Sequence, residues 1–291
     1  MSRRGWLLFS AMSVIWGIPY LLIKIAVAEL APATLVLVRV AIGTVVLLPI
    51  TVRRRELIPV LRHWRPLITY TVVELCIPWY FLAVAEQTLS SSLTGLLIAT
   101  VPLVSAVLVL ITGRERLGAR RLVGLVVGFA GVAALVGVDL HGSLLAVGAV
   151  AIVAVCYALG PVIQARYLSH LPDLGVVAAS LVVTMLVYLP FGVAQAPTRM
   201  PSAAALAAMV TLGVVCTAVA FVLFFRLIAE AGPARATVIT YVNPAVALVL
   251  GVVVLNESFT LTTAVGFGLI LLGSVWGTSR ERRAETVAAE P

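Results

Sequence analysis

Residues 142–165 read GSLLAVGAVAIVAVCYALGPVIQA, a run without Asp, Glu, Lys or Arg. A helix needs about 20 mostly apolar residues to cross the hydrocarbon core of a bilayer, and this run is long enough to do so. Six other stretches have the same character, and they are 5–23, 87–113, 174–198, 200–225, 236–256 and 258–279. The pattern predicts an all-α integral membrane protein whose main partner is the lipid bilayer.

The composition of the whole chain supports this prediction. Of its 291 residues 62% are hydrophobic and 11% are charged, and the mean hydropathy is +1.15. A soluble domain has about 25% charged residues, so this chain could not cover a water-facing surface. The composition excludes a cytosolic enzyme, a nucleic-acid binder and a disordered regulator. The three cysteines lie in apolar runs without metal-like spacing, and neither a metal nor another cofactor is expected.

Turn and charge signals divide the apolar sequence into ten spans. Residues such as Ala31-Pro32, Leu171-Pro172-Asp173 and Gly232-Pro233 separate neighbouring spans. The expected spans lie near 5–27, 33–51, 66–86, 93–112, 120–138, 143–165, 174–195, 202–226, 234–255 and 260–279.

The basic residues predict how these spans are oriented. With the N-terminus placed inside, 17 Lys and Arg residues fall on the inner side, whereas only Arg199 falls on the outer side. The other two, Lys24 and Arg39, lie within spans. Cytoplasmic segments of membrane proteins carry an excess of Lys and Arg. We therefore expect a multi-pass protein of the plasma (inner) membrane with both termini in the cytoplasm.

The two halves of the chain resemble each other at an offset of 142 residues. Each half contains five expected spans, and an odd number requires the second half to be inverted relative to the first. Inverted repeats are typical of secondary transporters, with the substrate site near the midplane between the halves. The expected domains are 1–139 and 140–280, followed by a short disordered cytoplasmic tail at 281–291. The positions that recur are Pro19, Lys24, Pro102, Glu115, Gly124 and Gly131, as Pro161, Arg166, Pro244, Glu257, Gly266 and Gly273.

These positions resemble the EamA-type members of the drug/metabolite transporter superfamily. Trp16-Gly17, Lys24, Pro32 and Arg39 are similar to the opening of such proteins, and each half ends with the family's order of Pro, apolar run, Glu and Gly-rich span. The chain departs from the usual Gly before each Glu, since Arg114 and Asn256 stand there. The resemblance implies a ten-helix fold of two inverted five-helix repeats. It also implies carrier activity towards small metabolites, often as an exporter.

Glu74 is the acidic residue expected deepest in the membrane. It lies about eight residues into its span, or ~12 Å along the helix axis. A carboxylate at that depth is unfavourable by about 2.5–3.5 kcal/mol and usually faces a cavity or a partner. Two interpretations stay open. Glu74 either pairs with Arg39, at a vertical gap on the order of 9 Å, or it binds substrate or couples transport to protons.

Aromatic and polar side chains near midplane prolines are candidates for lining a substrate cavity. Trp16, Tyr20 and Lys24 share one helix face because they are spaced by four residues. Tyr157 and Gln164 flank Gly160-Pro161 in a later span. The expected substrate-binding residues are Trp16, Tyr20, Arg39, Glu74, Trp79, Tyr80, Pro102, Tyr157, Gln164, Tyr241 and Asn243.

Other residues are expected to act structurally. Pro19, Pro161 and Pro244 are expected to kink their spans, which is tolerated where a cavity or a neighbour satisfies the freed backbone groups. Glu115 and Glu257 each precede a span, and a carboxylate at this position complements the N-terminus of the following helix.

The leading hypothesis is a secondary transporter that exports a small metabolite, such as an amino acid or a drug-like amphipathic compound. It would work by alternating access between the repeats, either coupled to protons or uncoupled. An intramembrane enzyme is an alternative, but Glu74 alone does not supply a catalytic constellation, so enzymatic activity is not expected. A non-transporting scaffold or sensor is the second alternative.

Overall fold

The computed structural model describes residues 1–111, 118–138 and 144–278, and every regular element in these ranges is a helix. The first part of the chain contains α1 (Arg3–Ile15), α2 (Ile18–Val27), α3 (Pro32–Arg53), α4 (Leu57–Arg62), α5 (Trp64–Thr71), the π-helix η1 (Val72–Cys76), α6 (Ile77–Glu86), α7 (Ser91–Ile98), α8 (Val101–Ile111) and α9 (Ala119–Val138). The second part contains α10 (Leu144–Ile163), the π-helix η2 (Gln164–Leu168), α11 (Asp173–Ala194), α12 (Ala203–Gly213), the π-helix η3 (Val214–Val219), α13 (Ala220–Ala231), α14 (Pro233–Ala236), α15 (Ile239–Leu255) and α16 (Leu261–Thr278).

Eight helical stretches within the described ranges are long and apolar enough to cross a membrane. Two further apolar helices, Ile239–Leu255 and Leu261–Gly277, are shorter. A helix of 17 residues such as α15 is about 25 Å long, somewhat less than the hydrocarbon core. The all-helical membrane class is thus confirmed, whereas the count of ten spans stays a prediction. The eight stretches are Arg3–Val27, Pro32–Arg53, Trp64–Glu86, Ser91–Ile111, Ala119–Gly137, Leu144–Leu168, Asp173–Ala194 and Ala203–Ala231.

Several of these stretches are interrupted near a proline. Pro78 has no N–H to donate to the carbonyl of Glu74, and the preceding turn widens into η1, with Glu74 at its centre. Similarly, α7 ends at Ile98 and α8 begins at Val101, immediately before Pro102. Widened turns of this kind are frequent at functional sites, and η1 carries the side chain of Glu74.

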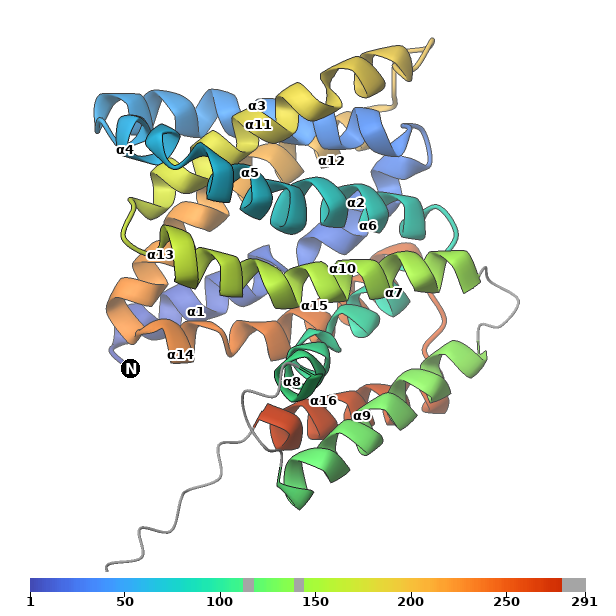
Figure 1. Ribbon diagram of the computed structural model, residues 1–291. Helices are drawn as coiled ribbons and strands as arrows, with labels where there is room; N and C mark the ends of the chain where they lie inside the picture. The colour runs from blue at the N-terminus through green and yellow to red at the C-terminus, as the bar shows by residue number, and fades with distance from the viewer. Residues whose placement is uncertain (112–117, 139–143, 279–291) are drawn as a thin grey trace, which may run out of the picture.

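The two parts of the chain pack against each other rather than forming separate bodies. α3 lies along α11, α6 along α10, α7 along α15 and α9 along α16 (Figure 1). The backbones of α9 and α16 approach each other closely. A Cβ atom added at Gly131 would lie only 2.6 Å from the carbonyl oxygen of Gly266. Small residues permit such backbone approach between membrane helices.

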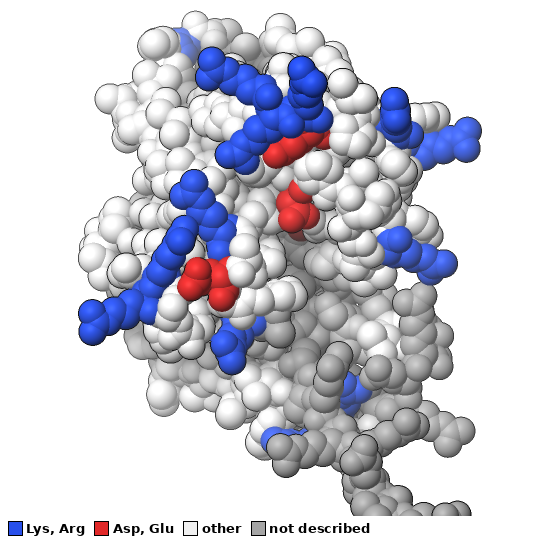
Figure 2. All heavy atoms as spheres, turned by 90° about the vertical axis from the view of Figure 1, so that its left-hand side faces the viewer, with Lys and Arg blue, Asp and Glu red and all other residues white. Residues whose placement is uncertain are grey.

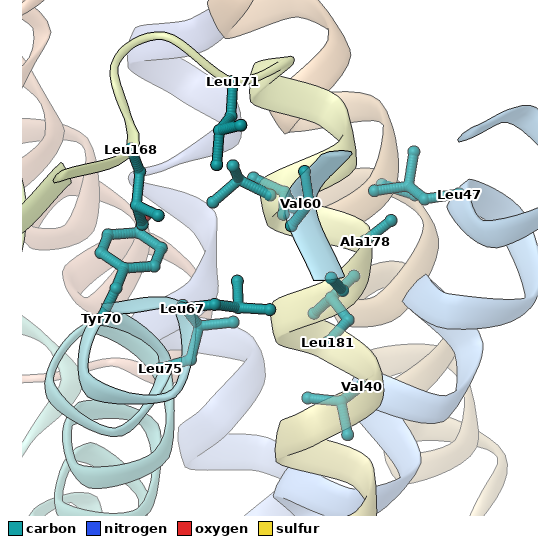
Figure 3. Close-up of a cluster of buried hydrophobic side chains, with 14 of the residues drawn as sticks. Val40, Leu47, Val60, Leu67, Tyr70, Leu75, Leu168, Leu171, Ala178 and Leu181 are labelled. Carbon is teal, nitrogen blue, oxygen red and sulfur yellow. The ribbon is translucent and has the colours of Figure 1, made fainter. Parts of the chain in front are cut away.

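A large apolar core joins α3, α4 and α5 to α11 (Figure 3). Val40, Leu47, Val60, Leu67 and Leu181 are each no more than 1% exposed. Because these side chains come from both parts of the chain, this core fixes the position of α3 relative to α11. It thereby fixes the helix that carries Arg39.

Charged side chains gather at one end of the bundle (Figure 2). This end, the left-hand side of Figure 1, holds the beginning of α1, α4 and the α13–α14 junction. We name it the basic face. The segments 28–31, 87–90, 195–202 and 256–260 connect helices at the other end, which we name the opposite face.

Candidate functional site

Arg39 is buried in the first half of α3, with 6% of its surface exposed. Its Nε atom donates a 3.0 Å hydrogen bond to Oγ1 of Thr217, and its guanidinium carbon lies 3.7 Å from the ring centroid of Trp79. Thr217 lies in η3, and its hydroxyl in turn donates to the carbonyl of Leu212 at 2.8 Å. The two terminal amino groups of Arg39 have no hydrogen-bond partner within the described ranges. They can therefore bind an anionic group.

Two tyrosines complete this part of the site. Tyr157 of α10 lies near Trp79, Arg39 and Glu74. Tyr20 of α2 lies within electrostatic range of Tyr157 and Arg39. Side chains from α2, α3, η1, α6 and α10 thus lie near one another. The structure brings together five of the expected substrate-binding residues, namely Tyr20, Arg39, Glu74, Trp79 and Tyr157.

Glu74 projects from η1 towards α10 and is half-buried. Its Oε2 atom is inaccessible and has no hydrogen-bond partner in the part of the chain that the structure describes. Glu74 and Arg39 do not form an ion pair there, since the guanidinium is engaged by Thr217 and Trp79. The expected alternative of a direct Arg39–Glu74 pair is therefore wrong for this conformation.

Gly160 provides the space for the Glu74 carboxylate. A Cβ atom at this position would overlap Oε2 of Glu74. We expect Gly160→Ala to lower stability by about 1–3 kcal/mol, as overpacking does, measured as a lower thermal unfolding temperature in detergent.

The matched control is Gly148→Ala, on the same helix, where a Cβ atom meets nothing within 4 Å. In a Glu74→Ala background, Gly160→Ala should lose its effect, because the overlapping atoms are gone. Equal unfolding temperatures for Gly160→Ala and the parent would contradict this account.

Several other expected site residues lie in different environments. The Trp16 ring packs against Phe224 and Phe221 of α13, with ring centroids 4.6 and 5.9 Å away. Tyr80 stacks on Tyr188 of α11 at 5.9 Å. These contacts anchor α1 and α6 to the second part of the chain.

The remaining expected positions are at helix ends or interfaces. The amide nitrogen of Asn243, in the orientation that satisfies the group, donates to the carbonyls of Ile239 and Ser13 at 2.9 and 3.0 Å. Asn243 therefore ties α15 to α1. Three of these side chains are half-buried, namely Gln164 at the start of η2, Pro102 and Tyr241. The three expected kink residues differ in burial. Pro19 lies in the first turn of α2, Pro244 is buried within α15, and Pro161 is exposed. Glu115 lies outside the described residues.

Glu257 caps a different helix from the expected one. Its carboxylate accepts hydrogen bonds from the backbone N–H groups of Ser91 and Ser92, at 2.7 and 2.9 Å, at the N-terminus of α7. The sequence predicted that it would complement α16. Asn256 adopts a left-handed conformation with φ 54° and turns the chain at the end of α15, which directs Glu257 across to α7.

This contact has a defined pH dependence. Burial raises the pKa of Glu257, but hydrogen bonds from Ser92 and Ser91 outweigh it and leave the pKa below its ordinary value. A carboxyl group whose pKa is lowered by folding stabilises the folded state at pH values above its unfolded-state pKa. This stabilisation is lost as the pH falls through the folded-state pKa. We expect Glu257→Gln to lower stability by about 0.5–2 kcal/mol at neutral pH, the typical value of a lost helix cap.

The difference should disappear as the pH falls through the lowered folded-state pKa of Glu257, because the parent carboxylate is then itself protonated. Thermal unfolding of parent and variant across this range measures it. A difference that persists at the acidic end would show that the carboxylate charge does not hold α7.

Two residues of this region were missed by sequence reasoning. Thr217 contacts Arg39, but apolar spans contain many such small polar residues. Glu86, at the end of α6, is fully buried with both carboxylate oxygens lacking a hydrogen-bond partner in the described ranges. In the sequence, Glu86 lies at the end of an expected span, where a charged residue does not by itself indicate a functional site.

The fold and its buried polar site define a multi-span membrane protein. Comparison with known protein families identifies the family to which it belongs. Residues 3–137 and again 144–278 match the EamA-like transporter family. The chain belongs to this family, and the resemblance noted from the sequence is confirmed.

Individual relatives are similar over nearly their whole length. An uncharacterized transporter of Archaeoglobus fulgidus is 22% identical over 273 residues, which are 93% of this chain and 97% of the relative. The uncharacterized inner membrane transporter YedA of Escherichia coli is 28% identical over 91% of this chain and 87% of its own. A solved crystal structure with 21% identity superimposes with a TM-score of 0.67, covering 96% of this chain and 97% of the other, which shows the same fold. These relatives are transporters rather than enzymes by name.

Proposed function

We propose that this protein is a secondary carrier that exports a small metabolite, such as an amino acid or a drug-like amphipathic compound. The observation that carries the proposal is the pair of polar groups, Arg39 and Glu74, that lie near Tyr157 inside a membrane-spanning bundle. Intramembrane ionisable residues usually mark a transport pathway. Here both groups retain hydrogen-bonding capacity that the described protein atoms do not use.

The chemistry of the site favours a substrate with both polar and apolar parts. The terminal amino groups of Arg39 form a planar fork that suits a carboxylate or another planar anion. Glu74 suits an ammonium group or a proton. The rings of Tyr20, Trp79 and Tyr157 offer apolar surface near these two groups.

In this proposal the two repeats, 1–139 and 140–280, are inverted relative to each other and alternate between two openings. Ten spans are then required, with α15 and α16 as the last two. The division of Lys and Arg between the two ends supports this arrangement, and so does the gathering of charge at the basic face (Figure 2). The basic face would be cytoplasmic, in the plasma membrane.

This orientation predicts a labelling pattern in intact cells. Met200 is 83% exposed in the segment between α11 and α12, and Arg62 is exposed at the end of α4. Cysteine at Met200 should react with a membrane-impermeant maleimide added outside, whereas cysteine at Arg62 should react only after permeabilisation. The reverse pattern would refute the orientation.

Transport itself is tested with purified protein in sealed proteoliposomes. A suitable probe panel consists of labelled leucine as a zwitterion, lactate as a carboxylate and ethidium as an aromatic cation. The proposal expects exchange of at least one of these compounds above the level of empty liposomes, and loss of that exchange in Arg39→Gln. A protein that exchanges none of the three would contradict the proposed substrate chemistry.

A further inference from the structure

His63 and His170 meet at the basic face, although they are 107 residues apart in the chain. Their Nε2 atoms lie 3.4 Å apart, and the ring centroids are 4.9 Å apart with the ring planes at 74°. His63 lies between α4 and α5, and His170 lies between η2 and α11. One histidine thus comes from each of the two parts of the chain that match the family. The sequence predicts no metal site, because nothing in it brings these two residues together.

The apolar core beneath the two histidines holds their backbones in place. Each histidine has, within four residues on either side, a core side chain that is no more than 7% exposed. These flanking residues are Val60 and Leu67 around His63, and Leu168 and Leu171 around His170 (Figure 3). Ligands that are held by packed neighbours form a more precise binding site than ligands on a loose loop. The pair is therefore preformed, although both imidazole rings are exposed.

The hydrogen bonds of His63 define which of its two nitrogens can bind a metal ion. Its Nδ1 atom lies 3.0 Å from the carbonyl oxygen of Pro59. A carbonyl oxygen can only accept a hydrogen bond, so Nδ1 carries the proton of the neutral ring. Nε2 then carries a lone pair, and it faces His170. A ring N–H that donates to a backbone carbonyl is also the usual arrangement behind a metal-binding histidine.

The separation of the two Nε2 atoms suits one shared metal ion. Two nitrogens bound to a tetrahedral Zn²⁺ at about 2.0–2.1 Å are about 3.3–3.4 Å apart, which matches the 3.4 Å seen here. In the absence of metal, Nε2–H of His170 donates to Nε2 of His63. When a metal ion binds, this proton moves through water to Nδ1 of His170, which frees the second lone pair. The soft torsion of an imidazole ring allows both lone pairs to be directed at the ion.

Imidazole ligands select one class of metal ion. They suit Zn²⁺, Cu²⁺ and Ni²⁺, whereas Mg²⁺ and Ca²⁺ prefer oxygen ligands. No third His, Cys, Asp or Glu joins the pair within the described ranges, so water completes the coordination sphere.

The arginines close to the pair in the chain do not prevent the binding of a cation. Arg65 lies over the ring of Trp64 at 5.3 Å, and Arg166 lies over the ring of Tyr167 at 5.4 Å. Both arginines are exposed, and water and salt weaken the repulsion between exposed charges. The metal–nitrogen bonds act at much shorter range.

We propose that His63 and His170 form a binding site for a divalent transition-metal ion, of which Zn²⁺ is the representative. The ion joins the α4–α5 junction to the segment before α11, and it holds the two parts of the chain together at the basic face. This site requires neither Arg39, nor Glu74, nor a transported substrate, so it goes beyond the proposed function.

Titration of the purified, tag-free protein with Zn²⁺ in detergent tests the site by calorimetry. The parent should bind Zn²⁺ saturably, and Mg²⁺ should not bind. His63→Gln and His170→Gln should each weaken Zn²⁺ binding by about 100-fold, because each leaves only one arm of a two-armed site. Zn²⁺ should also raise the thermal unfolding temperature of the parent, because it binds the folded state, and should not raise that of either variant.

The chain offers a matched control for these substitutions. His141→Gln removes the remaining histidine and should keep the parent affinity. The three cysteines are buried and do not compete for the ion. Because both histidines of the site are exposed, the variants should remain folded, and their unfolding temperatures without metal check this.

A parent protein that does not bind Zn²⁺ would overturn the proposal. Parent affinity in either His63→Gln or His170→Gln would do the same, since it would show that the two rings do not share one ion. The measurement involves no flux, so its failure is distinguishable from failure of the proposed function.

Discussion

Glu74→Gln should remain folded and continue to exchange substrate, while net flux driven by a pH gradient is lost. Glutamine has the shape of the carboxyl group and fills the space beside Gly160, but it cannot bind and release a proton. Burial in a low-dielectric environment favours the neutral form of a carboxyl group. Proton loading of Glu74 is therefore compatible with the packed structure. Net flux and one-for-one exchange are measured in proteoliposomes between about pH 5.5 and 8.

The control for this experiment is Glu230→Gln. Glu230 accepts a hydrogen bond from Ser2 and lies at the end of α13 on the basic face, away from the site. It should keep parent flux at every pH. Unaltered pH-driven flux in Glu74→Gln would end the coupling hypothesis. Loss of folded protein would instead indicate that Glu74 acts structurally.

Arg39→Lys should raise the substrate concentration at half-maximal flux by about 10- to 150-fold. A lost hydrogen bond to a charged group is worth about 1.5–3 kcal/mol, and every 1.4 kcal/mol is about tenfold in affinity. Lysine keeps the positive charge but has no planar guanidinium. It therefore cannot at the same time donate to Thr217, lie flat against Trp79 and present two further parallel N–H groups to a substrate. The maximal flux should change less than the half-saturation concentration.

A second variant tests how Arg39 is oriented. Thr217→Val removes the acceptor of the 3.0 Å bond from Nε without a change of size and should weaken binding less than Arg39→Lys. Arg199→Lys, in the exposed segment between α11 and α12, is the matched control for the arginine substitution. Equal half-saturation concentrations in Arg39→Lys and Arg199→Lys would exclude Arg39 from the binding site.

The sequence was sufficient to predict the fold class, because long uncharged runs can only be accommodated in a membrane. It also placed Arg39 and Glu74 deep within their spans. What it could not supply is the direction in which each side chain points around its helix axis. The π-helix η1 shifts this direction at Glu74, and helical periodicity alone does not anticipate such a shift.

The same limit explains the two corrected contacts. The depth of Arg39 and Glu74 suggested an ion pair, but Trp79 and Thr217 occupy the guanidinium instead. The position of Glu257 before α16 suggested a local cap, but the carboxylate crosses to α7 after the turn at Asn256. Contacts between distant segments depend on packing, which a single sequence does not display.

In the proposed carrier, Arg39 is part of the site through which substrate crosses the membrane. Exchange of labelled leucine, lactate and ethidium in proteoliposomes tests it most directly, with the parent, Arg39→Gln and Arg199→Gln reconstituted at equal amounts. The account predicts that the compound exchanged by the parent is exchanged equally by Arg199→Gln and not by Arg39→Gln. Parent-level exchange in Arg39→Gln would contradict it.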